Sequence, residues 1–491
     1  CFFLLFQFIF FFINYIYCED FNLYGEAGQA YALVINIGHP PQKLHVLVDT
    51  GSTTLAIAAY ARKDSSIYFH KENSTSLYNS GKEVQAKYSQ GTWSGTLASD
   101  FIQFPTLPTV PEVRSDLALI TKSYKFFMNG SGWQGLLGLA YLPVAAWGDS
   151  VVVGSWLDFA EKVNGRALSF ELKLCGSTSP VNATHYGNLR MFALFNTLCE
   201  YDRNASEAGE YVFRTPILRK RWYEIGVLAI RVSNSTAERE RAANGTRDPN
   251  DVDFEECRLI NAEKSIVDSG TTGIRMPDAV FRRVVGELRS SARTSNTLVL
   301  DEFWYHGEAA CWPEPQEWNL PSLAVDILAS EADDRFFTLE IPAQSFMRVI
   351  SARNKSASSG SVSEFCYKLG LEAAPGTVLG YTAMEGLQVL FNRSAGWIGW
   401  RESSCGPAAR TSGPWNASGS LLSSCGLDRS LPDVNVSIKA AQWTLCAISV
   451  VAGAVLVYLL APCIKMFPVR RLPRSQQISL SQAALVDRDT T

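Results

Sequence analysis

The chain has 491 residues, of which 47% are hydrophobic and 19% are charged, a balance typical of a folded globular protein with room for two cores. Its formal net charge is -4, and no basic stripe interleaved with aromatic residues occurs before residue 440. This composition argues against intrinsic disorder and against nucleic-acid binding.

An almost wholly apolar run, residues 1–17, opens the chain and is followed by acidic Glu19 and Asp20. Such a run resembles the hydrophobic part of a secretory signal, and a membrane span is the alternative. We interpret residues 1–17 as a signal-like segment.

Short apolar or alternating runs, such as residues 31–37 and 44–48, follow and are separated by clusters of Gly, Pro, Asn and Asp. This pattern is typical of a β-rich domain of short strands. Helical periodicity is confined to a few stretches, of which residues 156–163 and 281–293 are the better candidates. The polar stretch at residues 233–253 is interpreted as a solvated insertion loop.

A short motif occurs twice along the chain. An Asp-Thr/Ser-Gly triplet after an apolar run begins at Asp49 and again at Asp268. Each is later followed by two apolar residues and a glycine, at residues 136–138 and 378–380. One such triplet makes an ordinary turn, but two in the same context predict two related lobes that each supply one aspartate.

Two neighbouring carboxyl groups suit the hydrolysis of a peptide bond. One carboxylate takes a proton from water while the other, still protonated, donates to the carbonyl oxygen. Like charges this close share a proton, so we expect Asp49 and Asp268 to act as a catalytic pair at acidic pH. The flanking residues are expected to support them: Gly51 and Gly270 by allowing tight turns, Ser52 and Thr271 by donating to the outer carboxylate oxygens, and Thr50 and Ser269 by tying the turns together.

Near the C-terminus, residues 443–464 contain no charged side chain and have the length of a membrane-spanning helix. A buried core helix is the alternative. Lys465, Arg470 and Arg471 follow, so the tail at 465–491 is expected in the cytoplasm and the preceding chain outside it or in a lumen. Asn-x-Ser/Thr sequons occur only before this run, as expected for a glycoprotein. Residues 427–442 would be a linker.

Longer matches now identify a family. From about residue 25 to 426 the chain resembles the pepsin-like aspartic proteases, and among them the membrane-anchored beta-secretase subfamily. The matching segments are residues 28–31, 40–42, 49–53, 88–95, 125–133, 138–141 and 265–272. The resemblance implies an all-β, bilobal pepsin-like fold with lobes at 25–175 and 176–426, followed by the single transmembrane helix. It also implies an aspartic endopeptidase that acts on proteins or peptides and needs no metal or organic cofactor.

The resemblance also implies roles for individual residues around the aspartates. Tyr88 would be the aromatic residue of a hairpin flap that closes over the substrate, with Gln90 and Trp93 beside it. Phe127 and Trp133 would line apolar subsites, Thr272 would offer polar groups to an extended peptide, and Arg275 would face an acidic or polar substrate side chain. Without the resemblance, Tyr88 would be an ordinary strand residue, and Phe127 and Trp133 could equally be core aromatics. Arg275 could equally be a solvated surface arginine.

The cysteines follow the same resemblance, which implies the disulfides Cys175–Cys405, Cys257–Cys425 and Cys311–Cys366. Cys199 has no partner in that pattern. Disulfides favour an oxidising compartment, so we expect a single-pass protein of the secretory and endosomal pathway or cell surface, with its protease domain luminal or extracellular.

Two other interpretations of this chain stay open. A non-catalytic receptor or adhesion ectodomain on the same fold would explain the sequons, the cysteines and the apolar helix, but not both aspartate turns. A general acid protease of a lysosome-like compartment would explain the aspartates but not the anchor. Metal-dependent hydrolysis has no support, because His-Glu-x-x-His is missing and the histidines do not cluster.

Overall fold

Short strands dominate the computed structural model, as the alternating sequence pattern predicts. The chain divides into two compact units, residues 1–427 and 428–491. The structure describes residues 21–25, 30–89, 91–128, 131–141, 153–165, 167–177, 184–192, 211–233, 252–293, 300–314, 316, 318–330, 334–357, 360–417, 419–428, 443–445, 447–452 and 455.

The largest sheet in the described part of the first unit has 13 strands in the order β11-β25-β24-β9-β10-β1-β2-β3-β8-β4-β7-β6-β5. Their bounds are β1 (Leu23–Gly25), β2 (Ala32–Ile37), β3 (Gln42–Asp49), β4 (Leu55–Ala58), β5 (Tyr78–Lys87), β6 (Thr92–Gln103), β7 (Val113–Tyr124), β8 (Gly135–Gly138), β9 (Ser169–Ser177), β10 (His185–Phe192), β11 (Phe213–Pro216), β24 (Leu387–Asn392) and β25 (Trp397–Glu402). Strand β2 alternates between buried and partly exposed residues, so one of its faces packs into the core.

Three smaller sheets complete the described strands, in the orders β12-β13-β15-β23-β16-β22, β14-β18-β19-β26 and β17-β21-β20. Their bounds are β12 (Arg219–Lys220), β13 (Tyr223–Glu224), β14 (Val227–Val232), β15 (Ser265–Asp268), β16 (Ile274–Met276), β17 (Ala310–Trp312), β18 (Leu323–Leu328), β19 (Arg335–Ile341), β20 (Met347–Ala357), β21 (Gly360–Leu369), β22 (Leu371–Ala373), β23 (Thr377–Gly380) and β26 (Arg410–Asn416).

The duplication in the sequence has a counterpart in the strand pairing. Strand β3 pairs in parallel with β8, and β15 pairs in parallel with β23. In each case the following strand pairs antiparallel with the second strand of the pair, β4 with β8 and β16 with β23. On its other side it pairs in parallel with a further strand, β4 with β7 and β16 with β22. Two segments that are far apart in the chain therefore have one topology, and each begins with a strand that ends in an aspartate.

In the described part of the first unit, helices are few and mostly short. They are α2 (Trp156–Asn164), α4 (Phe254–Ile260), α5 (Asp278–Arg293), α6 (Asp301–His306), α7 (Ala343–Phe346) and α8 (Leu421–Ser424), with 3-10 turns η1 (Lys71–Asn73) and η4 (Tyr381–Ala383). The two stretches predicted to be helical lie in α2 and α5. Helix α4 begins where the polar stretch ends, because the Asp253 side chain accepts hydrogen bonds from the N–H groups of Glu255 and Glu256. Residues 234–251 lie outside the described residues.

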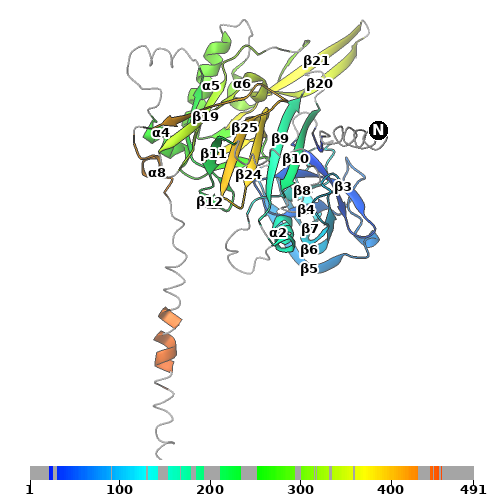
Figure 1. Cartoon of the computed structure of the whole chain (residues 1–491). Coiled ribbons are helices and arrows are strands. Elements are labelled where there is room, and N and C mark those ends of the chain that lie inside the picture. The colour runs from blue at the N-terminus through cyan, green and yellow to red at the C-terminus, as the bar shows by residue number, and fades with distance from the viewer. Residues whose placement is uncertain are drawn as a thin grey trace, which may run out of the picture. The chain divides into compact units, whose positions relative to one another are not determined.

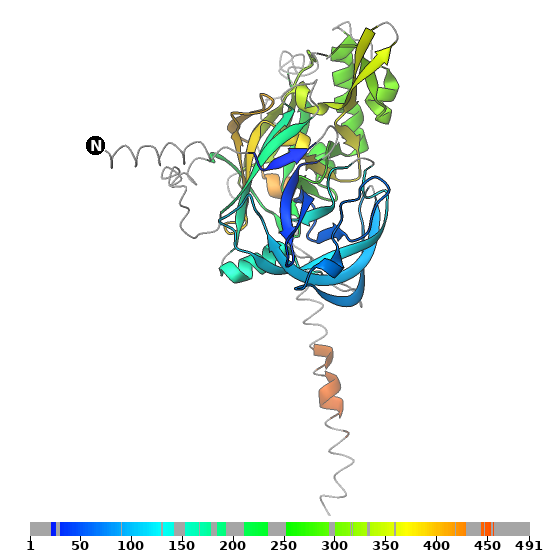
Figure 2. The same cartoon turned by 90° about the vertical axis from the view of Figure 1, so that its right-hand side faces the viewer.

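Figures 1 and 2 show how the first unit is arranged. Strands β3 to β8, blue to cyan, gather at one end, and the green to yellow elements, including α5, α6, β20 and β21, gather at the other. Strands β9, β10, β24 and β25 run between them (Figure 1). The lobe boundary expected at residues 175/176 falls inside β9, in the sheet that the two halves share.

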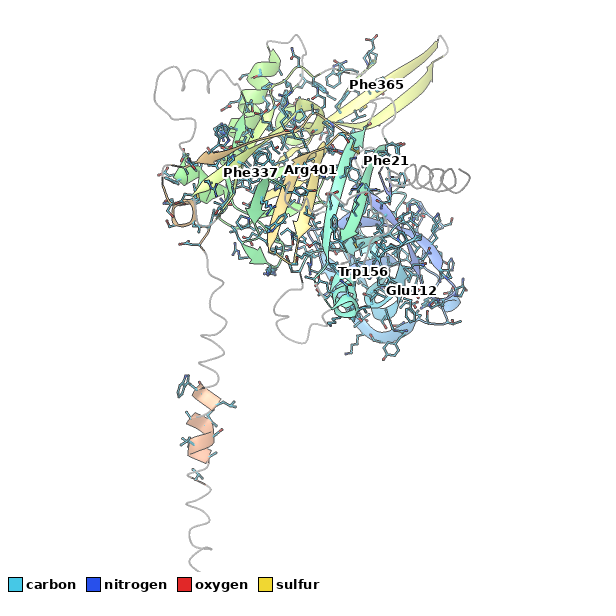
Figure 3. All side chains as sticks on the ribbon, in the orientation of Figure 1. Phe21, Glu112, Trp156, Phe337, Phe365 and Arg401 are labelled. Carbon is cyan, nitrogen blue, oxygen red and sulfur yellow. A yellow bond between two sulfur atoms is a disulfide. The ribbon has the colours of Figure 1, made fainter. Side chains whose placement is uncertain are left out.

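Buried apolar side chains of both halves form one contiguous cluster. Figure 3 labels Trp156 on α2 and Phe337 on β19, which belong to this cluster. The Trp156 ring meets the Phe104 ring edge-on, with 4.6 Å between centroids. Shared burial of this kind favours a fixed arrangement of the two halves.

Three disulfides join distant parts of the first unit: Cys175–Cys405, Cys257–Cys425 and Cys311–Cys366. These are the pairs that the resemblance implies, and Cys199 lies outside the described residues. Disulfides of this kind are typical of secreted or extracellular domains. Among the residues that the structure describes, no helix has both the length and the apolar character needed to span a bilayer. Much of the apolar run at 443–464 lies outside those residues.

Candidate active site

Asp49 and Asp268 lie at the ends of the two equivalent strands, β3 and β15. In the parallel ladders, Asp49 is opposite Gly138 and Asp268 is opposite Gly380. The motifs that repeat in the sequence, aspartate turn and later glycine, are thus neighbours in space. Each parallel pair, one in the 13-stranded sheet and one in the 6-stranded sheet, thus places its aspartate beside the glycine of the partner strand.

Each carboxylate accepts the same set of hydrogen bonds from its own turn. The Gly51 N–H donates to Asp49 Oδ1 at 2.8 Å, and the Ser52 hydroxyl donates to Oδ2. The Gly270 N–H donates to Asp268 Oδ1 at 2.9 Å, and the hydroxyl of Thr271 donates to Oδ2 at 2.6 Å. Four donors thus fix the orientation of the two carboxyl groups, and Ser52 and Thr271 take the positions expected of them.

Hydrogen bonds of Thr50 and Ser269 join the two turns. The Thr50 N–H donates to Ser269 Oγ at 3.1 Å, and the N–H of Ser269 donates to Thr50 Oγ1 at 2.9 Å. Each hydroxyl also donates across the pair, Thr50 to the Val267 carbonyl and Ser269 to that of Val48. All four bonds are buried, so they hold the turns at a fixed spacing.

The two glycines allow the aspartates to approach each other. A Cβ atom on Gly51 would lie 2.5 Å from Asp268 Cγ, and one on Gly270 would lie 2.3 Å from Asp49 Oδ1. Each turn therefore faces the carboxyl group of the other, and a larger residue at either position would collide with it.

This geometry changes the acidity of Asp49. Burial, the charge of Asp268 and a hydrogen bond between the two carboxyl groups raise the pKa of Asp49 well above its usual value. The hydrogen bonds from Ser52 and the Gly51 N–H lower this pKa, but by less. A buried pair of this kind can hold one proton between two carboxylates, which is the state that acid-base hydrolysis needs.

The hairpin of β5 and β6 brings Tyr88 to the pair. Its tip closes with a 2.8 Å bond from the Tyr88 N–H to the Gly91 carbonyl. Burial, followed by the charge of Asp49, raises the pKa of the Tyr88 phenol. Polar interactions with Trp93 and Ser52 offset only part of this rise. Tyr88 thus lies close enough to interact with both Asp49 and Ser52. Gln90 lies outside the described residues.

Comparison with known proteins agrees with this site. Residues 30–179 match the family described as eukaryotic aspartyl protease. The chain is 29% identical to the beta-secretase of Strongylocentrotus purpuratus over 460 residues, which cover 88% of this chain and 80% of that protein. The chain is a pepsin-like aspartic protease. It is therefore an aspartic-type endopeptidase, and its substrates are peptides or proteins.

Shorter similarities reach other members of this protease family. Pepsin A-5 of Mus musculus is 31% identical over 115 residues, 23% of this chain and 29% of that protein. Pregnancy-associated glycoprotein 2 of Bos taurus is 34% identical over 116 residues, 23% of this chain and 30% of that protein.

Aromatic side chains of the protease gather beside the hairpin. The Phe127 and Trp133 rings have centroids 5.0 Å apart, and Phe126 lies between Trp133 and Tyr88, at 5.7 and 5.4 Å. Trp133 is buried, and Phe127 is half-buried beneath the Arg62 guanidinium. These rings form an apolar wall beside Tyr88.

Thr272 and Arg275 follow the second aspartate turn of the protease. The Thr272 carbonyl accepts a 3.1 Å hydrogen bond from the Thr382 N–H, so its backbone oxygen is used within the fold. Arg275 donates to Glu372 at 3.0 Å and to Ser89 at 3.1 Å. Sequence reasoning did not place Glu372 at this site, because nothing near residue 372 points to residue 275.

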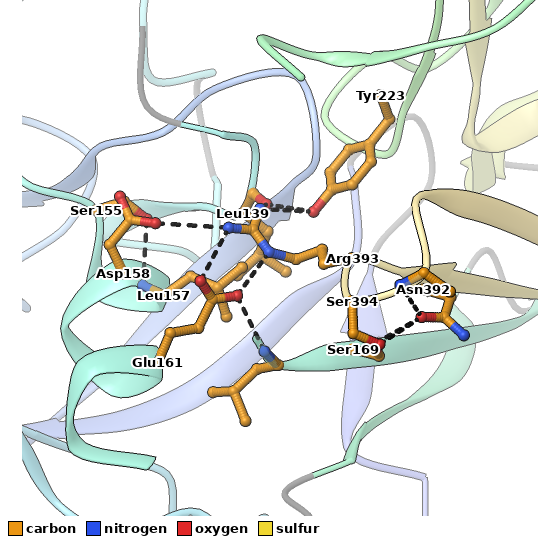
Figure 4. A network of polar contacts seen from close by, with 12 residues as sticks. Leu139, Ser155, Leu157, Asp158, Glu161, Ser169, Tyr223, Asn392, Arg393 and Ser394 are labelled. Atoms are coloured by element: carbon orange, nitrogen blue, oxygen red, sulfur yellow. Dashed lines mark hydrogen bonds and ion pairs between the residues drawn. The ribbon is translucent and has the colours of Figure 1, made fainter. Parts of the chain in front are cut away.

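A network of polar contacts around Arg393 leads to the Asp49 turn, and Figure 4 shows the part that joins Arg393 to Glu161 and Tyr223 to Leu139. Arg393 bonds Glu161 at 2.8 Å and the Tyr223 hydroxyl at 3.2 Å. Tyr223 donates to the Leu139 carbonyl at 2.7 Å, and the Leu139 N–H donates to the Asp49 carbonyl at 2.8 Å. Sequence reasoning missed this chain of contacts, because its members come from segments that are far apart.

Proposed function

We propose that this protein is a membrane-anchored aspartic endopeptidase in which Asp49 and Asp268 together activate the attacking water. One carboxylate removes a proton from water while the other carboxyl group protonates the scissile carbonyl oxygen. As the tetrahedral intermediate collapses, the proton that the first carboxylate took from water passes to the leaving amine, and a hydroxyl group of the intermediate returns a proton to the second carboxylate. No covalent bond between protein and substrate forms.

The reciprocal contact between the two turns is the observation that carries this proposal. Each glycine leaves no room for a side chain beside the opposite carboxyl group. A water molecule held by one carboxylate would therefore also be near the other. The mechanism needs one carboxyl group to keep its proton, and the raised pKa of Asp49 means that it does so at a higher pH than an ordinary aspartate. We expect work at acidic pH, where this proton is retained.

The remaining site residues fit supporting roles. Tyr88 and its hairpin would close over an extended peptide and exclude water, with Trp93 behind them. Phe127 and Trp133 would bind apolar side chains next to the cut. Arg275 would bind a polar or acidic side chain, because a guanidinium offers several donors in one plane.

Membrane anchoring is the other part of the proposal. The apolar run at 443–464 with basic residues after it supports one crossing, with the tail at 465–491 in the cytoplasm. Apolar side chains in the described part of this run are exposed, including Trp443, Val450 and Val455. The protease unit would then act on membrane or luminal proteins in the secretory and endosomal pathway or at the cell surface.

A peptide library tests the catalytic part of this proposal. The full chain, purified in detergent, is incubated with the library from acid to neutral pH beside Asp49→Asn and Asp268→Asn. We expect cleavage in acid by the wild type alone. If both variants cut as well as the wild type, the assignment to these aspartates fails. If a folded wild type cuts nothing, a receptor-like role on this fold takes its place.

A further inference from the structure

Arg275 spans from the second aspartate turn to the hairpin tip. It lies in β16, which follows that turn directly and pairs with β23 and β22. Its Nη1 donates to the hydroxyl of Ser89, the residue after Tyr88. A peptide held between the hairpin and the two aspartates would therefore pass beside this guanidinium.

Glu372 faces the same guanidinium from the neighbouring strand. Arg275 and Glu372 are opposite each other in the parallel β16–β22 ladder, and Arg275 Nε donates to Glu372 Oε2 at 3.0 Å. The Arg275 side chain is only 15% exposed, whereas that of Glu372 is 47% exposed. The Glu372 carboxylate thus already occupies the Nε edge of the Arg275 guanidinium.

We infer that Glu372 determines specificity at the Arg275 subsite by partly neutralising the arginine, so that the subsite favours neutral polar side chains over acidic ones. This inference rests on the proposed protease function. A substrate carboxylate would gain little from a guanidinium whose charge Glu372 already partly neutralises and whose Nε Glu372 already occupies. A substrate amide or hydroxyl would lose nothing to Glu372 and could still accept a hydrogen bond from the guanidinium, which has five N–H donors.

Paired peptides that differ only in Asp against Asn, at each position around one cut, test this inference. The ratio of kcat/KM for the Asp and Asn peptides is measured for the wild-type full chain and for Glu372→Gln, at the highest pH at which the wild type still cleaves. We expect Glu372→Gln to raise this ratio about fivefold at one position, the effect of removing one partly exposed charge.

Two further variants make the comparison specific. Asp301→Asn is the matched control, because Asp301 pairs with Arg289 at similar exposure but on helices α5 and α6. It should leave the ratio unchanged. In an Arg275→Gln background, Glu372→Gln should also change nothing, because Glu372 would act through Arg275.

The possible outcomes separate this inference from the proposed function. A raised ratio in Glu372→Gln that is lost in the Arg275→Gln background supports it. An unchanged ratio, with the Asn peptide still cleaved, overturns the role of Glu372 and leaves the protease assignment intact. If the wild type cleaves neither peptide, the proposed function and this inference fall together.

Discussion

The two turn glycines, Gly51 and Gly270, have little freedom to change. A Cβ on Gly51 would lie 2.5 Å from Asp268 Cγ, so Gly51→Ala has to push the carboxyl groups apart. Displacements of about 1 Å can cost about 100-fold in rate, and we expect a loss of kcat/KM of that order. Gly132→Ala is the control, because no atom lies within 4 Å of its Cβ position. Equal activity of the two variants would contradict the close approach.

The raised pKa of Asp49 predicts how stability depends on pH. A carboxyl group whose pKa is higher in the folded than in the unfolded state, about 3.9 for Asp, stabilises the fold below that pH. This contribution is lost as the pH rises through the folded-state pKa. Asparagine stays neutral, so Asp49→Asn should melt at a higher temperature than the wild type at neutral pH.

Thermal melting of the two proteins from acid to neutral pH checks this expectation. The difference in Tm should shrink as the pH falls toward about 4, where the wild-type carboxyl group is protonated as well. A difference that stays constant, or that grows in acid, would mean that Asp49 is not a buried group with a raised pKa.

At the scale of single residues, the sequence predicts the hydrogen bonds between residues that are close together in the chain. Asp49 and Asp268 accept hydrogen bonds from residues two and three positions further on, so the motif itself contains the donors. The contact of Arg275 with Ser89 and Glu372 joins three distant segments. Such contacts depend on how strands come together, which a motif does not record.

Among the elements, the repeated motif predicts the two strands that end in aspartate, β3 and β15, but not their parallel pairing with β8 and β23. Helices α2 and α5 follow from their periodicity. Helix α4 could also have been predicted, because Asp253 caps it and acidic Glu255 and Glu256 lie in its first turn. That both halves share one sheet could not have been predicted, because strand order depends on contacts between distant residues.

The network around Arg393 predicts a large effect on stability. Its side chain is 3% exposed and bonds Glu161 and Asp158 of α2. Arg393→Met would leave two partly buried carboxylates without their partner, so we expect unfolding to become easier by about 3 kcal/mol. Denaturant titration measures this change.

Measurements at lower pH and a control variant on the surface make the Arg393 test more specific. Burial raises the pKa of Asp158, so lower pH should neutralise it and reduce the loss in Arg393→Met. Arg282→Met, which breaks an ion pair on the surface of α5, should cost about 0.5 kcal/mol or less. If both variants lose the same stability, the buried network is no more important than a surface pair.

For the whole molecule, the division near residue 427 separates the protease unit from the proposed anchor. A chain that ends at residue 442 keeps all three disulfides and loses the apolar run. Expressed in secretory cells, it should appear in the medium, whereas the full chain should resist alkaline carbonate extraction from membranes. Release of the full chain by carbonate would contradict the anchor.

The central claim, that Asp49 and Asp268 act as one unit, is tested most directly by kcat/KM for the wild type, Asp49→Asn, Asp268→Asn and the double variant on one peptide. Groups that act together are not additive, so each single variant should lose about 1000-fold or more and the double variant no more than either. Substantial activity in either single variant, or losses that multiply in the double variant, would contradict the shared mechanism.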